Sequence, residues 1–211
     1  MKKLLFGLIA TVMFGVAGNA QSDFDAAGLQ HNKVLEVLLT KCGKNVNKTN
    51  VFDISKSLII QNFPEYKNTQ FIKFDSYSTP ENLLEQISKK GLISTTLYNL
   101  VVTDLKTLKQ LDSYSKVASF VENAKSSSAL KNLSKEDSLS YMNYLSVLKH
   151  SSYFWDVEGK NGMSIGVLYP PTAVSKFSLF KMWFCDAAGA FAGGAGAPIS
   201  SFIYYVSEYP Y

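Results

Sequence analysis

The chain of 211 residues is 46% hydrophobic, 13% aromatic and 18% charged, a composition that excludes a disordered chain or a coiled coil. Its formal net charge is +4, and two of the lysines lie in an N-terminal stretch that we expect to be removed. With a mature charge so close to neutral and with scattered lysines, the sequence does not indicate a nucleic-acid partner.

Residues 1–20 have the pattern of a secretory signal peptide. Two lysines precede an apolar core at residues 4–16, which is too short for a comfortable membrane span. Gly18 and Ala20 supply small residues before the expected cleavage point at Gln21. The sequence therefore predicts an exported protein, periplasmic or secreted, whose mature chain is long enough for one domain.

Residues 21–155 predict a bundle of about six amphipathic helices. Apolar residues recur at helical spacing, and short polar links carrying capping residues separate the segments. The expected helices cover residues 27–42, 50–63, 79–90, 97–111, 117–124 and 134–155. Six helices with short links are typical of a mainly α, single-domain helical bundle.

The character of the chain changes after the bundle. Residues 156–176 predict a polar turn followed by a short extended segment at 163–169, for which residues 70–74 are the best partner strand. Residues 177–211 are first aromatic and then rich in alanine and glycine. We expect this C-terminal segment to pack on the bundle as a helix or a helical hairpin.

Small residues recur every four positions in the C-terminal segment, which is a glycine-zipper pattern. The residues expected at a close helix contact are Gly189, Ala192, Gly193, Gly196 and Ala197. Such strips let another helix approach closely. Three alternatives follow: a helix or hairpin packed on the bundle, a zipper that associates with a membrane or with copies of itself, and a loose glycine-rich tail.

The stretch 187–206 has no charged residue and is long enough to span a bilayer. The middle of this stretch contains Pro198 and the pair Ser200 and Ser201. A spanning helix would therefore be weakly apolar and bent, which argues against a stable anchor. The alternative to a binding or structural protein is therefore a membrane-active, toxin-like secreted protein that inserts residues 187–206.

Cys42 and Cys185 are the only cysteines. In an oxidising compartment they could pair and close a long loop, which would stabilise the fold by roughly 4 to 5 kcal/mol. Two separately buried thiols are the alternative.

His31 and His150 are the only histidines, and no metal-binding spacing such as HExxH or CxxC occurs. The sequence thus predicts no metal site and no cofactor. His31 shares an apolar stripe with Val34 and Leu38, so we expect it to be buried and hydrogen-bonded for structural reasons. Asn32 borders the same face and should bond a neighbouring backbone group, while His150 should lie at a helix C-terminus.

Two other patterns could carry chemistry. Asp23 with Asp25, and Asp156 with Glu158, are paired acids that we expect to be solvated turn residues rather than cation ligands. The letters GMSIG at residues 162–166 fit G-x-S-x-G, so a hydrolase using Ser164 is a minor alternative. In that fold the histidine follows the serine, whereas both histidines here precede it, and we assign no catalytic residue.

The sequence GLQHNKVL at residues 28–35, the segment SYMNYLSVLKHSSYFW at 140–155 and the Ala/Gly-rich tail carry a resemblance. Together with the leader they resemble uncharacterised exported bacterial helical proteins with a glycine-zipper-like segment near the C-terminus. No activity comes with this resemblance. Since the sequence shows no assembled acid, base, nucleophile or metal cluster, we expect a non-enzymatic binding or structural protein with a protein partner, self-association or membrane association.

Overall fold

The computed structural model describes residues 24–42, 46–74, 79–158, 179–193 and 196–208. Within these ranges the regular structure is helical and no strand forms. The expected mainly α bundle is therefore confirmed.

All six helices expected before residue 156 are present. They are α2 (Ala26–Lys41), α3 (Val51–Asn62), α4 (Pro80–Lys89), α5 (Thr95–Leu108), α6 (Tyr114–Lys125) and α7 (Lys135–Tyr153). Two more helices follow, α9 (Leu179–Gly189) and α10 (Gly196–Glu208). Short 3-10 helices cover η1 (Pro64–Tyr66), η2 (Ser128–Asn132) and η5 (Ala190–Ala192), and η3 (Phe154–Glu158) is a π-helical continuation of α7.

Side-chain caps explain why several helices begin where they do. Thr79, Ser94 and Ser134 each accept a hydrogen bond from the backbone N–H three residues later, at 3.0–3.2 Å. These bonds satisfy amide groups that the first helical turn leaves without a partner. Asn50 also precedes its helix, but its side chain accepts from the backbone N–H of Asn47 at 2.8 Å instead.

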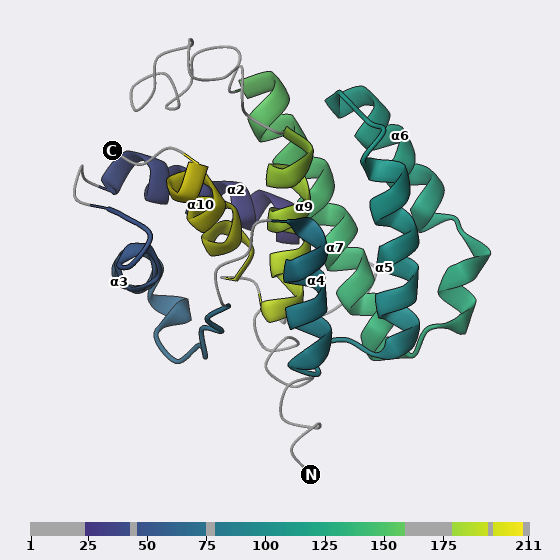
Figure 1. The fold of residues 1–211 in the computed structure, drawn as a ribbon, viewed down its shortest axis with the longest axis horizontal. Coiled ribbons are helices and arrows are strands. Elements are labelled where there is room, and N and C mark those ends of the chain that lie inside the picture. The colour runs from purple at the N-terminus through teal and green to yellow at the C-terminus, as the bar shows by residue number, and fades with distance from the viewer. Residues whose placement is uncertain (1–23, 43–45, 75–78, 159–178, 194–195, 209–211) are drawn as a thin grey trace.

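Helix α7 lies at the centre of the bundle and contacts α2, α6 and α9. Helices α5 and α6 lie beside it at one end of the molecule, and α3 lies at the other end (Figure 1). Helix α9 packs against α7, α4 and α10, so the C-terminal hairpin forms part of the core.

Aromatic side chains fill the space between α7 and the C-terminal hairpin. The ring of Tyr144 stacks on Tyr141 and on Phe191, with centroids 5.7 and 5.4 Å away, and meets the edge of Phe184 at 6.4 Å. All four rings are buried, so the hairpin is held mainly by removal of apolar surface from water.

The stretch 187–206 is a helical hairpin rather than one long helix. Helix α9 ends at Gly189, and Gly193 adopts a φ of +93° before α10 begins at Gly196. A positive φ suits glycine because glycine lacks a Cβ atom. The four-residue spacing of Gly189, Gly193 and Ala197 therefore does not place them on one helical face.

The small residues do allow a close contact, but inside the hairpin. A Cβ atom built on Gly189 would lie 2.7 Å from Cα of Ala197 and 2.9 Å from the carbonyl oxygen of Gly196. One built on Gly196 would lie 2.8 Å from Cβ of Ala192. Gly193 has open space around it, so its role is the turn and not the contact. In the described part of the chain, no helix is both long and apolar enough to cross a membrane.

The short extended pair expected from the sequence does not form in the described part of the chain. Residues 70–74 form no strand, and their expected partner at 163–169 lies outside the described residues.

Asp156 is buried in η3 and accepts a hydrogen bond from the backbone N–H of Tyr114 at 2.8 Å. The expectation of a solvated turn was therefore wrong for Asp156, because its carboxylate caps α6 from a distant part of the chain.

Cys42 and Cys185 are both buried, and no disulfide joins them in the structure. Burial raises the pKa of the Cys42 thiol to about 12. A thiol with so high a pKa carries almost no thiolate at neutral pH and is correspondingly unreactive.

Candidate functional site: a buried histidine–aspartate centre

The most unusual polar feature of the bundle is a contact between His31 on α2 and Asp186 on α9. Nε2 of His31 lies 2.9 Å from Oδ1 of Asp186, and neither side chain has any exposed surface. Burying a carboxylate without compensation would be very unfavourable. The two atoms are close but are not aligned for a hydrogen bond, so the imidazole is a polar neighbour of this oxygen rather than a bonded donor.

The second carboxylate oxygen of Asp186 also has partners. Oδ2 accepts a hydrogen bond from Oγ of Ser151 at 2.6 Å and one from the indole Nε1 of Trp155 at 3.0 Å. Both donors belong to the α7–η3 segment and are buried. Asp186 therefore connects α9 to α2 through one oxygen and to α7 and η3 through the other.

Asn32 completes the surroundings of the imidazole. Its Oδ1 lies 2.8 Å from Nδ1 of His31, and its Nδ2 donates to the backbone carbonyl oxygen of His150 at 3.1 Å. The His31 ring is buried and hydrogen-bonded, and the Asn32 amide bonds a backbone group of α7. That these residues have a structural role stays a prediction.

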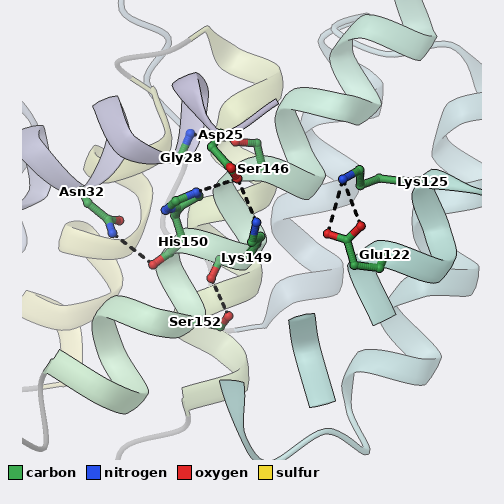
Figure 2. Close-up of polar contacts among 9 residues, drawn as sticks. All are labelled: Asp25, Gly28, Asn32, Glu122, Lys125, Ser146, Lys149, His150 and Ser152. Carbon is green, nitrogen blue, oxygen red and sulfur yellow. Dashed lines mark hydrogen bonds and ion pairs between the residues drawn. The ribbon is translucent and has the colours of Figure 1, made fainter. Parts of the chain in front are cut away.

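An outer polar layer continues from this centre towards the surface (Figure 2). Oδ1 of Asp25 lies 2.9 Å from Nε2 of His150 and 3.0 Å from Nζ of Lys149. Burial alone would raise the pKa of Asp25, but the hydrogen bonds and charges of His150 and Lys149 lower it below its ordinary value. Lys149 and Lys125 also lie over the ring of Phe24, at 5.6 and 4.1 Å from its centroid.

A glycine brings α2 close enough to α7 for these contacts. The backbone N–H of Gly28 donates to Oγ of Ser146 at 2.9 Å. A Cβ atom at this position would lie 2.6 Å from the carbonyl oxygen of Ser146 and 2.4 Å from Cδ2 of His150. Any larger residue at 28 would push α2 away from both polar layers.

A second buried acid contacts α7 nearer its N-terminal end. Asp104 on α5 accepts a hydrogen bond from the hydroxyl of Tyr141 at 2.8 Å. Burial raises the pKa of Asp104 to about 7, although the bond from Tyr141 opposes this shift. Burial and the nearby Asp104 charge raise the pKa of Tyr144, whose hydroxyl has no hydrogen-bond partner among the described residues.

The centre around Asp186 differs chemically from a nucleophilic site. In such a site the serine hydroxyl bonds to the histidine that takes its proton. Here Asp186 stands between Ser151 and His31, so the serine donates to the acid and not to the base. All three side chains are buried. The arrangement can join helices.

Sequence reasoning identified His31, Asn32 and His150 but missed Asp186, Ser151 and Trp155. The available signal was an acid at the edge of a long uncharged stretch, since a charge there needs a partner once the stretch is buried. Asp23 and Ser164 lie outside the described residues, as does the side chain of Glu158. Within the described ranges, no group of three metal-ligating side chains comes together.

No family model matches the chain, and neither the curated proteins nor the solved structures contain a significant match.

Proposed function

We propose that this is an exported protein that acts by binding or association rather than by catalysis, and that the His31–Asp186 centre maintains the shape of its bundle. The observation that carries the proposal is the use of both histidines in bonds between segments. His31 joins α2 to α9, and His150 joins the chain before α2 to α7. Groups that usually carry acid–base chemistry thus have structural partners here.

The C-terminal hairpin supports the same proposal. Gly189, Gly196 and Ala197 make their close contact with one another, and the aromatic residues around them are buried against α7. The small-residue segment therefore serves close helix packing inside the chain. Association with a partner would use the outer surface of the bundle.

A substrate screen of the mature protein, residues 21–211, tests the first half of the proposal. We expect no turnover of general esterase, peptidase or glycosidase substrates. Turnover that disappears in Ser164→Ala but persists in Ser151→Ala would contradict the proposal and support the hydrolase alternative. Ser151→Ala is the matched control because its hydroxyl is buried in the core.

Liposome flotation distinguishes a protein that acts by binding or association from the membrane-active alternative. The mature protein should stay in the soluble fraction without releasing an entrapped dye. Flotation together with dye release would support insertion of residues 187–206 instead. Fractionation of cells that express the full chain tests export, since a retained, unprocessed protein in the cytoplasm would contradict it.

A further inference from the structure

The carboxyl group of Asp104 lies between α5 and α7 with little to offset its burial. Asp104 is 6% exposed, and in the described part of the chain its hydrogen-bond donor is the hydroxyl of Tyr141, at 2.8 Å. One neutral hydroxyl offsets the burial of a negative charge only in part. The folded chain therefore favours the neutral acid, whereas water stabilises the charge in the unfolded chain.

The charged side chains of the surrounding helices do not offset the charge of Asp104. On α4, α5 and α6 they are exposed or partly exposed, and most form ion pairs with one another (Glu81–Lys109, Glu85–Lys89, Asp112–Lys116 and Glu122–Lys125). The other charged residues of these helices and of α7 and α9 lie at the surface or have other partners (Lys90, Lys106, Lys135, Glu136, Asp137, Lys149, His150, Lys181 and Asp186). The titratable groups that face Asp104 are the hydroxyls of Tyr141 and Tyr144. Burial and the Asp104 charge raise the pKa of both, so they stay protonated.

These two tyrosines of α7 connect Asp104 to the C-terminal hairpin. Tyr141 bonds Asp104, and its ring stacks on that of Tyr144 with the centroids 5.7 Å apart. Tyr144 in turn stacks on Phe191 in η5 at 5.4 Å and meets the edge of Phe184 in α9 at 6.4 Å. The rings nearest the carboxyl group are thus the same rings that hold the hairpin against α7.

We propose that ionisation of Asp104 loosens the attachment of the α9–α10 hairpin to α7, because water that hydrates the buried charge enters beside the Tyr141–Tyr144 stack. Among the described residues the hydroxyl of Tyr144 is buried without a hydrogen-bond partner. Water that enters there can therefore bond both this hydroxyl and the carboxylate. Release of α5 alone would hydrate the carboxylate but would break its bond to Tyr141.

The direction of the effect follows from the burial of Asp104. Its pKa is raised from 3.8 to about 7, so the closed hairpin retains a proton that a hydrated Asp104 releases. The attachment is firmest near pH 4, weakens as the pH rises to about 7, and changes little above that value.

Amide hydrogen exchange in the full mature chain tests the proposal, with the rates corrected for the intrinsic effect of pH on exchange. In wild type, the opening constants of α9 and η5 should rise by up to about tenfold per pH unit between about pH 5 and 7 and then level off. Asp104→Asn still accepts from Tyr141 but does not titrate, so its opening constants should stay nearly constant. Asp112→Asn removes an exposed acid and is the matched control, which should keep the wild-type response.

The reference helix in this experiment is α6, which packs on α7 away from the hairpin (Figure 1). An equal response in α6 would show that the whole bundle opens, and a response confined to α5 would show that α5 is released alone. Either result would overturn the proposal, as would equal hairpin responses in wild type and Asp104→Asn.

Tyr141→Phe decides the question if Asp104→Asn does not fold. It keeps the ring in the stack but removes the bond that lowers the pKa of Asp104. The opening constants of the hairpin should therefore level off at a higher pH than in wild type. An unchanged or lower pH for this levelling would overturn the proposal.

Discussion

Two buried acids contact α7, Asp186 near its C-terminal end and Asp104 nearer its N-terminal end, and their partners differ. Asp186 lies beside an imidazole and accepts from two donors, whereas Asp104 accepts from a single tyrosine hydroxyl. Burial raises the pKa of Asp104 to about 7, since no cation is bonded to it in the described structure. Both acids join two helices, and the comparison shows that the number of polar partners around a buried acid determines how far the cost of its burial is offset.

The largest expected effect comes from removing the better-partnered acid. Asp186→Ala leaves the His31 ring and the donors of Ser151 and Trp155 without their acceptor, so we expect a loss of about 3 to 5 kcal/mol in the free energy of unfolding. Urea denaturation measures it. Asp186→Asn is the control, because it keeps the shape and an acceptor and should lose less. An Asp186→Ala loss below about 1 kcal/mol would show that the centre contributes little.

Asp104 should make the free energy of unfolding depend on pH. Its pKa is raised from 3.8 to about 7, so between these values the folded state holds a proton that the unfolded state has released. Stability therefore falls as pH rises from about 4 to 7 and levels off above, by an amount on the order of 4 kcal/mol.

The matched variant for this prediction is Asp104→Asn, which still accepts from Tyr141 but does not titrate. Its free energy of unfolding should vary much less over the same pH range. If wild type and Asp104→Asn show the same pH dependence, Asp104 is not the group responsible.

The position of Asp186 depends on the close contact inside the hairpin, which can be probed by residue size. Gly189→Ala should lose about 1 to 3 kcal/mol because its Cβ meets the backbone of Ala197 and Gly196. Gly189→Leu should lose clearly more. Gly193→Ala and Gly193→Leu should lose similar amounts, because space is open there and only the φ of +93° matters. Thermal or urea denaturation measures these losses. A loss at position 193 that grows with side-chain size would contradict this assignment.

The smallest effect belongs to an exposed acid. The side chain of Asp25 is 41% exposed, so Asp25→Asn should lose less than about 1 kcal/mol, even with Lys149 and His150 nearby. Its pKa is lowered from 3.8. The stabilisation by ionised Asp25 is thus fully present above pH 3.8. It is lost as the pH falls through the lower pKa that Asp25 has in the folded state. A loss of several kcal/mol near neutral pH would show that the outer layer matters more than its exposure indicates.

Local sequence signals predicted the helices well because each signal acts within a few residues. Thr79, Pro80 and the residues that follow define α4 without help from the rest of the chain. The periodicity of small residues after Asp186 indicated close packing. It did not reveal the turn at Gly193, because glycine suits a packed helix face and a positive φ equally.

The candidate site could be predicted only in part. The stripe that contains His31 indicated a buried ring, but the stripe does not identify the acid that pairs with it. Asp186 is far from His31 in sequence, and their contact depends on how α2, α7 and α9 pack. Asp156 was missed for the same reason, since the N–H that it caps belongs to α6.

A double-mutant cycle on His31 and Asp186 tests the central claim most directly, because it measures the coupling between α2 and α9. The variants are His31→Ala, Asp186→Ala and their combination, with His31→Gln and Asp186→Asn as replacements if an alanine variant does not fold. We predict that the combined loss in free energy of unfolding is smaller than the sum of the single losses by about 2 to 3 kcal/mol. Losses that add to within about 0.5 kcal/mol would contradict the claim that this buried pair joins the two helices.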